Sequence, residues 1–551
     1  MIYLDSRHDP ARNAKLLASL WNNKISLKEA VQETNELFFQ HRIQPPLLQG
    51  GKKTYAQHKR AVFSGLLHAA EEFLFAEKAG SYSFDESELK WRKNGDCFPM
   101  WKEKLDNEYT ALSNGIRKEV NITDFGAVGD GVTDCTKAFE EALNGGYVKV
   151  IIPEGTFITR GIRLPSHSML RGQGKGRTIL KLHDEASRSA RLITNSQHVK
   201  GNSHILVEHM TLNWNVERLK DIEITSAGGH YSSCLTYANV QFGWVNSVEA
   251  VNPGLHCFDI SSALYNYSGD GFRAKRGSRY IWLNHLTGSG FGDDGITTHH
   301  SDYIFISNSH MADPSGRAHK EGFSNSNGIE VDDGSRHVVL MNNSTARCFG
   351  GVEIKAHHNS SAAANTQIIG HLSVHDNRSY NFRHIGHHQK EDPESLTACD
   401  IRATQLVAIE PVFTSLYKDS SPRALVVSAY RNVVVNHFLA IGDPLYDYQK
   451  NPVFALQYRS RNITLKNVIG RYFKRAGTDI RLYGGGNRTD NVRIVDSSFF
   501  KSAGVTVTVG AGLTHVEISN LKAVLEHNGK CLDLSPTANV DTHSVRVQQS
   551  R

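Results

Sequence analysis

The chain has 551 residues, of which 39% are hydrophobic and 21% are charged. This composition is typical of a globular chain with either several ordinary domains or one large repetitive domain. Its 46 glycines and 14 prolines are too few for a low-complexity or disordered chain. The formal net charge of +6 arises from 62 basic and 56 acidic residues. We therefore expect no nucleic-acid partner, although the small positive excess suits an anionic ligand.

No run of about 18 apolar residues occurs, which argues against membrane insertion. The first residues carry charges at short intervals, including Asp5, Arg12 and Lys15, and lack the apolar stretch of a secretory signal. We expect an extracellular or virion-associated protein without a classical signal peptide, released by lysis or within a phage particle. The 7 cysteines are scattered without a Cys-x-x-Cys pair, which indicates buried free thiols rather than disulfides or a zinc site.

Residues 1–117 have helical periodicity and are predicted to form a small α-helical module. Ser26 and Glu29 make a capping box ahead of an apolar stripe that stops at Pro45. A second helix is predicted over residues 55–79, and a third over residues 100–112. Nothing in this module suggests chemistry, so we expect an anchor or an oligomerisation element.

Residues 118–540 are predicted to form a β-solenoid. Short β-branched runs, such as 304–306, 433–435 and 463–465, are separated by Gly, Asn, Asp and Ser. In the clearer stretches successive runs start about 24–34 residues apart, a spacing typical of coils that stack as parallel strands. We expect this solenoid to be the catalytic domain, followed by a C-terminal tail over residues 541–551.

Five segments of the solenoid share a Gly-led alternation of apolar and other residues. Because alternate side chains of a strand point to opposite faces, the apolar positions should stack inward. These are Leu255, Phe272, Ile296, Ile329 and Val352, then Cys257, Ala274, Thr298, Val331 and Ile354. Two outward rows follow, namely His256, Arg273, Thr297, Glu330 and Glu353, then Phe258, Lys275, His299, Asp332 and Lys355.

The start of the solenoid resembles the pectate-lyase-like superfamily at residues 120–139, 150–157, 162–166 and 170–174. The resemblance is specific over residues 119–180 and extends through the coils to about residue 535. It implies an all-β solenoid, the right-handed single-stranded parallel β-helix of polygalacturonases, alginate epimerases and phage tailspike depolymerases. It also implies a polysaccharide substrate, often an acidic one, and, as in many tailspikes, a homotrimer.

Within this segment we predict a strand over residues 125–128, a turn at Asp130, and a short amphipathic helix over residues 133–143. The helix would close the open end of the coil stack. We interpret the acidic residues of this segment as turn and cap residues rather than catalysts, namely Asp124, Asp130 and Asp134.

The outward rows concentrate the candidate catalytic residues. Glu330 and Glu353 would lie on neighbouring strands about 4.8 Å apart, so one of them should have a raised pKa and act as a general acid. Asp332, or Asp294 one coil earlier, would stay ionised beside His299 and Lys355 and serve as base or nucleophile. A looser likeness to polygalacturonases supports three of these positions, namely Asp294, Asp332 and Lys355. Glu353 stands where those enzymes have arginine, and no Gly-His-Gly precedes it.

We take hydrolysis as the first hypothesis, with a lyase or C5-epimerase as the alternative. Abstraction of a C5 proton needs a base, for which His299, His357 or Tyr380 are candidates, and a cation to neutralise the uronate carboxylate. The predicted substrate-binding residues are Arg273, Lys275, His299, Lys355, His357, Tyr380, Arg383 and His384. A non-catalytic glycan-binding spike is a third hypothesis. We expect no cofactor and no metal site, with calcium left open.

Overall fold

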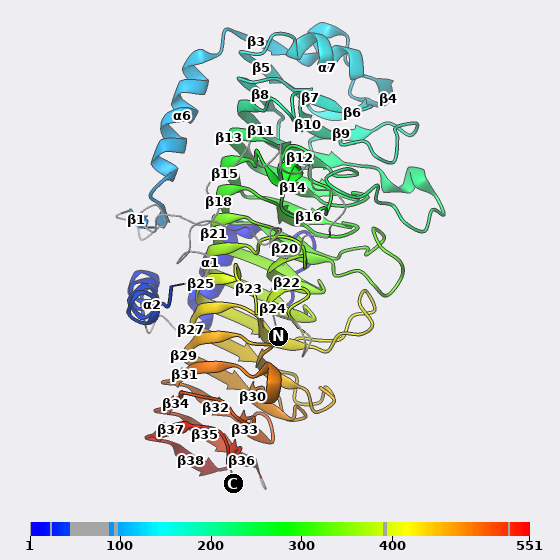
Figure 1. The fold of residues 1–551 in the computed structure, drawn as a ribbon. Coiled ribbons are helices and arrows are strands. Elements are labelled where there is room, and N and C mark those ends of the chain that lie inside the picture. Colours follow the sequence, from blue (N-terminus) through cyan, green and yellow to red (C-terminus); the bar gives the residue numbers. More distant parts are fainter. Residues whose placement is uncertain are drawn as a thin grey trace, which may run out of the picture.

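The structure is a computed structural model that describes residues 2–21, 25–44, 88–92, 97–388, 394–526 and 529–550. Its strands stack as successive coils of one elongated solenoid, from the cyan end beside α7 to the red C-terminus (Figure 1). The predicted helix over residues 55–79 lies outside the described residues. No helix in the described ranges has the length and apolar character needed to cross a bilayer.

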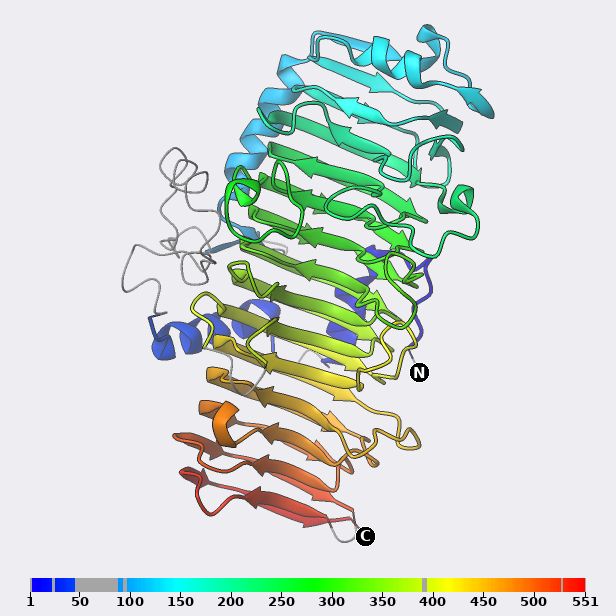
Figure 2. The ribbon, with the colours of Figure 1, turned by 45° about the vertical axis from the view of Figure 1, so that its right-hand side comes forward.

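One face of the solenoid is a sheet of 13 strands, from β7 (Ile162–Leu164) to β36 (Lys530–Leu534). Neighbouring strands in this sheet are parallel, and the longer strands of the other faces, such as β21 (Arg336–Ala346) and β23 (Ala364–Val374), pair in the same way. The predicted all-β parallel solenoid is therefore confirmed. The strands run as near-parallel rungs with loops projecting at their ends (Figure 2).

Apolar side chains fill the space between the faces in columns that run from coil to coil. One column lies directly in register across consecutive strands, and each of its members is fully buried: Phe258, Ile296, Ile329, Val352, Tyr380, Leu425, Phe454 and Ile480. Each coil thus buries apolar area against the coils on both sides, which is the main stabilising contribution in a stack of repeats. The cysteines of the described ranges form no disulfide, and all are buried as predicted except Cys531, which is partly buried.

The N-terminal helices lie along the outside of the solenoid. α1 (Asn13–Leu20) contacts β21 and β23, α2 (Leu27–His41) contacts β25 (Cys399–Ile409) and β27 (Arg431–Ile441), and α6 (Lys102–Gly115) contacts β11 (Asn202–Asn213). The Ser26–Glu29 capping box is present, and α6 confirms the helix predicted near residues 100–112. Two hydroxyls 2.8 Å apart, Thr34 and Thr404, join α2 to the solenoid. The role of these helices as anchor or oligomerisation element stays a prediction.

The two ends of the solenoid differ from expectation in detail. The first strand is β3 (Lys118–Asn121), and the predicted strand at 125–128 is wrong because residues 122–125 form a short 3-10 helix that ends at Gly126, with φ at 85°. α7 (Thr136–Leu143) closes the stack as predicted, with Phe139 buried. At the other end, residues 541–551 are not a free tail, since β37 (Val540–His543) and β38 (Arg546–Gln549) add further rungs.

The acidic residues near α7 serve local structure. Asp130 begins β4 (Asp130–Asp134), where its carboxylate accepts hydrogen bonds from the backbone N–H groups of Val132 and Thr133. Asp134 accepts one from the backbone N–H of Thr136 at the start of α7. The interpretation of these residues as turn and cap residues is confirmed.

Candidate active site

The predicted outward row is present on three strands of the 13-stranded sheet. β17 (Ile296–Thr298), β20 (Asn327–Val331) and β22 (Gly350–Ala356) pair with Thr297 opposite Glu330 and Glu330 opposite Glu353. The row continues to Asn381 on β24 (Arg378–His384). The two glutamates therefore lie side by side on neighbouring coils, as the sequence predicts.

The coil before β17 has a different register from the predicted one. β14 (Phe258–Ser261) pairs Phe258 with Ile296, so Asp259, rather than His256, lies opposite Thr297. The alternation over residues 253–258 was therefore assigned three residues too early. The correct row begins with an acid that sequence analysis did not single out.

Residues 262–278 form a loop between β14 and β15 (Arg279–Asn284), and an antiparallel bridge between Ser262 and Gly277 closes its base. Arg273 and Lys275 lie in this loop, next to a short 3-10 helix over Phe272–Ala274. Their predicted place in the outward rows is wrong, because a Gly-led alternation fits an inserted loop as well as a rung.

Two of the predicted substrate-binding residues point into the solenoid. Tyr380 lies opposite Val352 in the apolar column, and its hydroxyl donates a hydrogen bond to the backbone oxygen of Val407 at 3.0 Å. His384 is fully buried, with Nδ1 2.7 Å from the hydroxyl of Ser395. Neither side chain faces a substrate, so these two predictions are wrong. The period of two places Arg383 between them on the outward face, opposite Lys355.

A set of ionisable side chains gathers on the outward rows and the adjoining turns, and is called the charged cluster below. Its members are His256, Asp259, Asp293, Asp294, His299, Glu330, Asp332, Asp333, Lys355 and His357. The Lys355 Nζ lies 2.6 Å from Glu330 Oε1 and 3.8 Å from Asp332 Oδ2. Asp332 Oδ2 lies 3.8 Å from His299 Nε2 and 3.6 Å from His357 Nδ1. Two of the four predicted catalytic residues, Glu330 and Asp332, are thus brought together around one ammonium group.

Asp259 lies between two imidazoles of this cluster. Its Oδ2 is 3.5 Å from His256 Nδ1, and its Oδ1 is 3.4 Å from His299 Nδ1. The other nitrogen of each ring, Nε2, faces further acids: Asp294 at 3.5 Å from His256, and Asp332 at 3.8 Å from His299. The carboxylate of Asp259 therefore sets the orientation of both rings.

The two glutamates do not form the expected pair of competing charges. Each has its own cation, since Lys355 pairs with Glu330 and the Arg383 guanidinium donates to Glu353. Burial acts to raise the pKa of Glu330, but the Lys355 ammonium outweighs it and the pKa is lowered. The predicted raised pKa is therefore wrong for Glu330.

Two aspartates carry the raised pKa values instead. Burial, followed by the charge of Asp333, raises the pKa of Asp332 to about 7. Burial, followed by the charge of Asp293, raises the pKa of Asp294 well above its usual range. Their sequence neighbours change in the opposite direction: burial is outweighed by His319 and His256 at Asp293 and by His357 at Asp333, so both pKa values fall. Each Asp-Asp dipeptide thus combines a proton donor with an ionised carboxylate.

The charged cluster is largely covered, and only part of its rim reaches solvent. Asp332 and Asp259 are fully buried, whereas the side chain of His357 is 28% exposed. Tyr265, from the loop over residues 262–278, stacks on His299 with ring centroids 3.9 Å apart and donates a hydrogen bond to Asp333 at 2.9 Å. This tyrosine therefore covers His299 and Asp333 on the outer side of the sheet.

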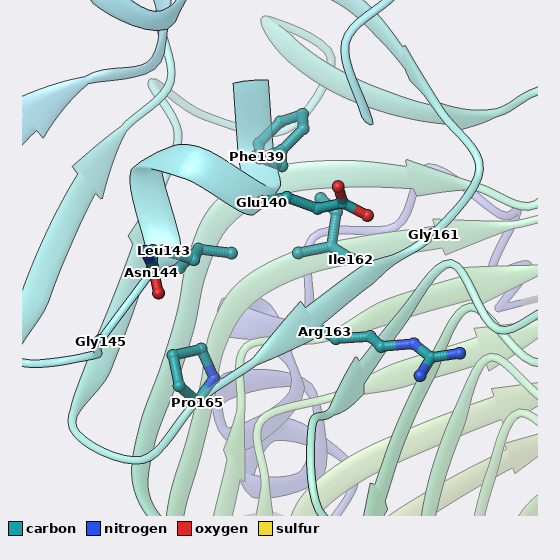
Figure 3. Close-up of a pocket in the computed structure, with 9 residues that line it drawn as sticks. All are labelled: Phe139, Glu140, Leu143, Asn144, Gly145, Gly161, Ile162, Arg163 and Pro165. Atoms are coloured by element: carbon teal, nitrogen blue, oxygen red, sulfur yellow. The ribbon is translucent and has the colours of Figure 1, made fainter. Parts of the chain in front are cut away.

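A cavity of about 320 Å³ adjoins the charged cluster at His319. Its walls include His319, Arg317, Glu223 and Ser324. His319 Nε2 lies 3.0 Å from Asp293 Oδ2, so the cavity touches the cluster through this ion pair. A second cavity, of about 250 Å³, lies beside α7 and is lined by Phe139, Glu140 and Arg163 among others (Figure 3). It belongs to the β7 end of the sheet and contains none of the cluster residues.

Sequence analysis missed three side chains of this region: Asp259, Tyr265 and His319. Asp259 was detectable, because the alternation Phe258-Asp259-Ile260 matches Ile296-Thr297-Thr298 as well as the assigned frame does. Tyr265 and His319 lie in loops, where no periodicity predicts which side chains fold back over the sheet.

Three comparisons place the chain among known proteins. A family described as rhamnogalacturonase A/epimerase, pectate lyase-like, matches residues 119–353. The chain is 50% identical over 442 residues to the phage-related protein YobO of Bacillus subtilis, covering 80% of this chain and 54% of that protein. It is 41% identical over 409 residues to the pre-neck appendage protein of Bacillus phage phi29, covering 74% of this chain and 47% of that protein.

The crystal structure of the N-terminal fragment of bacteriophage phi29 gene product 12 has the same fold. It aligns with a TM-score of 0.71 at 36% identity, covering 81% of this chain and 73% of that fragment. The chain spans about half the length of the curated relatives it matches.

Proposed function

Because the chain belongs to the pectate-lyase-like superfamily of parallel β-helix proteins, we propose that it is a depolymerase that cleaves glycosidic bonds in a bacterial surface polysaccharide. The observation that carries the proposal is the division of pKa values within the charged cluster. Asp332 has its pKa raised to about 7, next to carboxylates whose pKa values are lowered. Glycoside hydrolysis requires this combination of a protonated and an ionised carboxyl group.

In this mechanism Asp332 donates a proton to the leaving oxygen, and a water molecule adds to the anomeric carbon and returns a proton to the carboxyl groups of the cluster. Glu330, held ionised by Lys355, stabilises positive charge that develops on the sugar. His357 and Arg383 are 28% and 23% exposed in their side chains, so they are suited to contact an acidic sugar. The Tyr265 loop must move for a sugar ring to reach Asp332, since that residue is fully buried.

Two of the three candidate bases for a lyase or epimerase are unsuitable. Tyr380 lies inside the solenoid. His357 is surrounded by acids: burial acts to lower its pKa, but Asp332 and Asp333 raise it to about 9, so it is a cation at neutral pH and not a base. His299 remains the one predicted base on the outward face.

The phage relatives support a virion-associated location, where a surface polysaccharide is the barrier that the particle meets. A homotrimer with the solenoids side by side remains part of this proposal.

The proposal is tested by incubating the protein with a panel of neutral and acidic bacterial polysaccharides and analysing the products. Hydrolysis releases new reducing ends without an ultraviolet-absorbing sugar, and this is the expected result. An absorbing unsaturated end would establish elimination instead. Tight binding without any shortening of the polymer would establish a glycan-binding spike and overturn the enzymatic proposal.

A further inference from the structure

We propose that His256, Asp293, Asp294 and His319 bind one divalent transition-metal ion. His256 Nε2 lies 3.5 Å from Asp294 Oδ2 and 3.8 Å from Asp293 Oδ2. One ligand atom from each of these three residues lies within 4.8 Å of the others. His319 Nε2 is 3.0 Å from the same oxygen of Asp293. Small side-chain movements would bring the atoms of His256, Asp293 and Asp294 to the ligand distances of about 2.0–2.2 Å that a metal centre needs. His319, whose contact in this group is with Asp293, would complete the set after a larger movement of its side chain.

An unpaired polar atom gives a second, independent indication of a ligand at this position. Asp293 Oδ1 has no hydrogen-bond partner among the described residues, although Asp293 is only 8% exposed. A buried carboxylate oxygen without a partner is costly unless a proton, a cation or a metal ion compensates it.

Two other groups of acids and histidines in the cluster are less suited to a metal. The group of His299, Glu330 and Asp332 already has the Lys355 ammonium 2.6 Å from Glu330. In the group of Asp332, Asp333 and His357, the backbone N–H and Nδ1 of His357 and the Tyr265 hydroxyl already bond to Asp333. By contrast, the ion-pair partners of Asp293 and Asp294 in the described part of the chain are imidazoles. Asp294 Oδ1 accepts hydrogen bonds from the backbone N–H and Nδ2 of Asn327, while Asp294 Oδ2 faces His256.

Asp259 acts as a positioning residue for this centre. Its Oδ2 lies 3.5 Å from His256 Nδ1, on the side of the ring away from Asp293 and Asp294. A carboxylate behind a histidine keeps the proton on Nδ1 and leaves Nε2 free to bind a metal, an arrangement that is common in metal centres.

The composition of the group also selects the ion. Two imidazoles with two carboxylates suit zinc, manganese and related transition metals, whereas calcium prefers an all-oxygen set. The ion has an access route, because the side chains of His319 and Asp293 are 38% and 11% exposed and His319 lines the cavity of about 320 Å³. His256 precedes β14, Asp293 and Asp294 precede β17, and His319 lies in the loop between β19 (His310–Ala312) and β20. No spacing in the sequence predicts this combination.

The test is titration of chelator-treated protein with Zn²⁺ in a calorimeter. We expect one tight equivalent, weakened about tenfold or more by His256→Gln and by His319→Gln, and about 10–100-fold by Asp259→Asn. His299→Gln is the matched control, since that imidazole is equally buried and also faces Asp259. Its affinity should stay at the wild-type value. His319→Gln lies at the partly exposed rim, so it keeps the test valid if His256→Gln fails to fold.

The proposal is overturned if the wild type takes up no tight equivalent, or if His299→Gln weakens Zn²⁺ binding as much as His256→Gln. Calcium that competes with Zn²⁺ on equal terms would overturn the assignment to a transition metal. These measurements do not use activity. A protein that binds metal without cleaving any polysaccharide would contradict the proposed function alone, and cleavage without metal uptake would contradict this inference alone.

Discussion

The residues of the same outward row differ in chemical type between two regions of the solenoid. From β14 to β24 it reads Asp259, Thr297, Glu330, Glu353 and Asn381. From β26 (Arg423–Ser428) to β33 (Val505–Val509) it reads Val426, Ala455, Arg481 and Thr508, in the same register. The coils therefore stack without acids at the positions of this row. Burying carboxylates costs free energy, so their concentration in one region indicates chemistry rather than folding.

The largest expected effect is the loss of catalysis from the charged region alone. Asp332→Asn should lower the rate of depolymerisation by about 10²–10⁴-fold, because it removes the proton donor. Asp479 on β30 (Thr478–Leu482) is the matched control, since burial also raises its pKa to about 7. Asp479→Asn should leave the rate of reducing-end release unchanged. An equal loss in both regions would mean that the effect is structural.

A second contrast concerns stability. Lys355→Met leaves Glu330 and Asp332 buried without their cation, which should lower the free energy of unfolding by about 3–5 kcal/mol. Arg481 is exposed and lies between Ala455 and Thr508 in the row, so Arg481→Met should change the free energy of unfolding by no more than about 0.5 kcal/mol. Urea denaturation measures both. Similar losses of unfolding free energy in the two variants would show that Lys355 does not stabilise the buried carboxylates of the cluster.

Removing the hydroxyl of Tyr265, which covers the cluster, should have a smaller effect on the free energy of unfolding. Tyr265→Phe keeps the ring stacked on His299 but removes the hydrogen bond to Asp333. We expect a loss of about 1.5–3 kcal/mol in unfolding free energy, as for a hydrogen bond to a charged group. Thermal melts compared with those of Tyr472→Phe, at a half-exposed ring far along the chain, provide the reference. A change no larger than the reference would argue that the loop is not held by this bond.

The smallest expected effect, taken per pH unit, is a change in the free energy of unfolding caused by Asp479, which lies outside the charged cluster. The folded-state pKa of Asp479, about 7, exceeds its unfolded value of 3.8, so the folded protein binds the extra proton between these values. Stability from this group is therefore greatest at low pH and falls as pH rises toward 7, by at most about 1.4 kcal/mol per pH unit. Asp479→Asn should remove that slope from unfolding midpoints measured at several pH values. An unchanged slope would refute the assignment.

The sequence predicted the architecture well because each coil repeats the same alternation. Glu330 and Glu353 were placed on adjacent rungs by counting positions, and Lys355 was placed beside them in the same way. The predicted register is wrong on the coil of Asp259, where the alternation starts three residues too early. The loop over residues 262–278 carries a similar Gly-led pattern and is wrongly predicted as a further coil.

The electrostatics were less predictable than the register. Sequence spacing placed two glutamates together and suggested a shared proton, but the cations of Lys355 and Arg383 neutralise them individually. Which carboxyl group retains a proton depends on burial and on cations from other coils and loops. Such contacts between distant segments do not follow from any local pattern.

The pH dependence of kcat/KM for depolymerisation, from about pH 5 to pH 9, tests the central claim most directly. With Asp332 as the proton donor, the value should fall about tenfold per pH unit above about pH 7, where this carboxyl group loses its proton. A profile that stays level to pH 9, or that is the same in wild type and Asp332→Asn, would contradict the assignment of the charged cluster as the catalytic site.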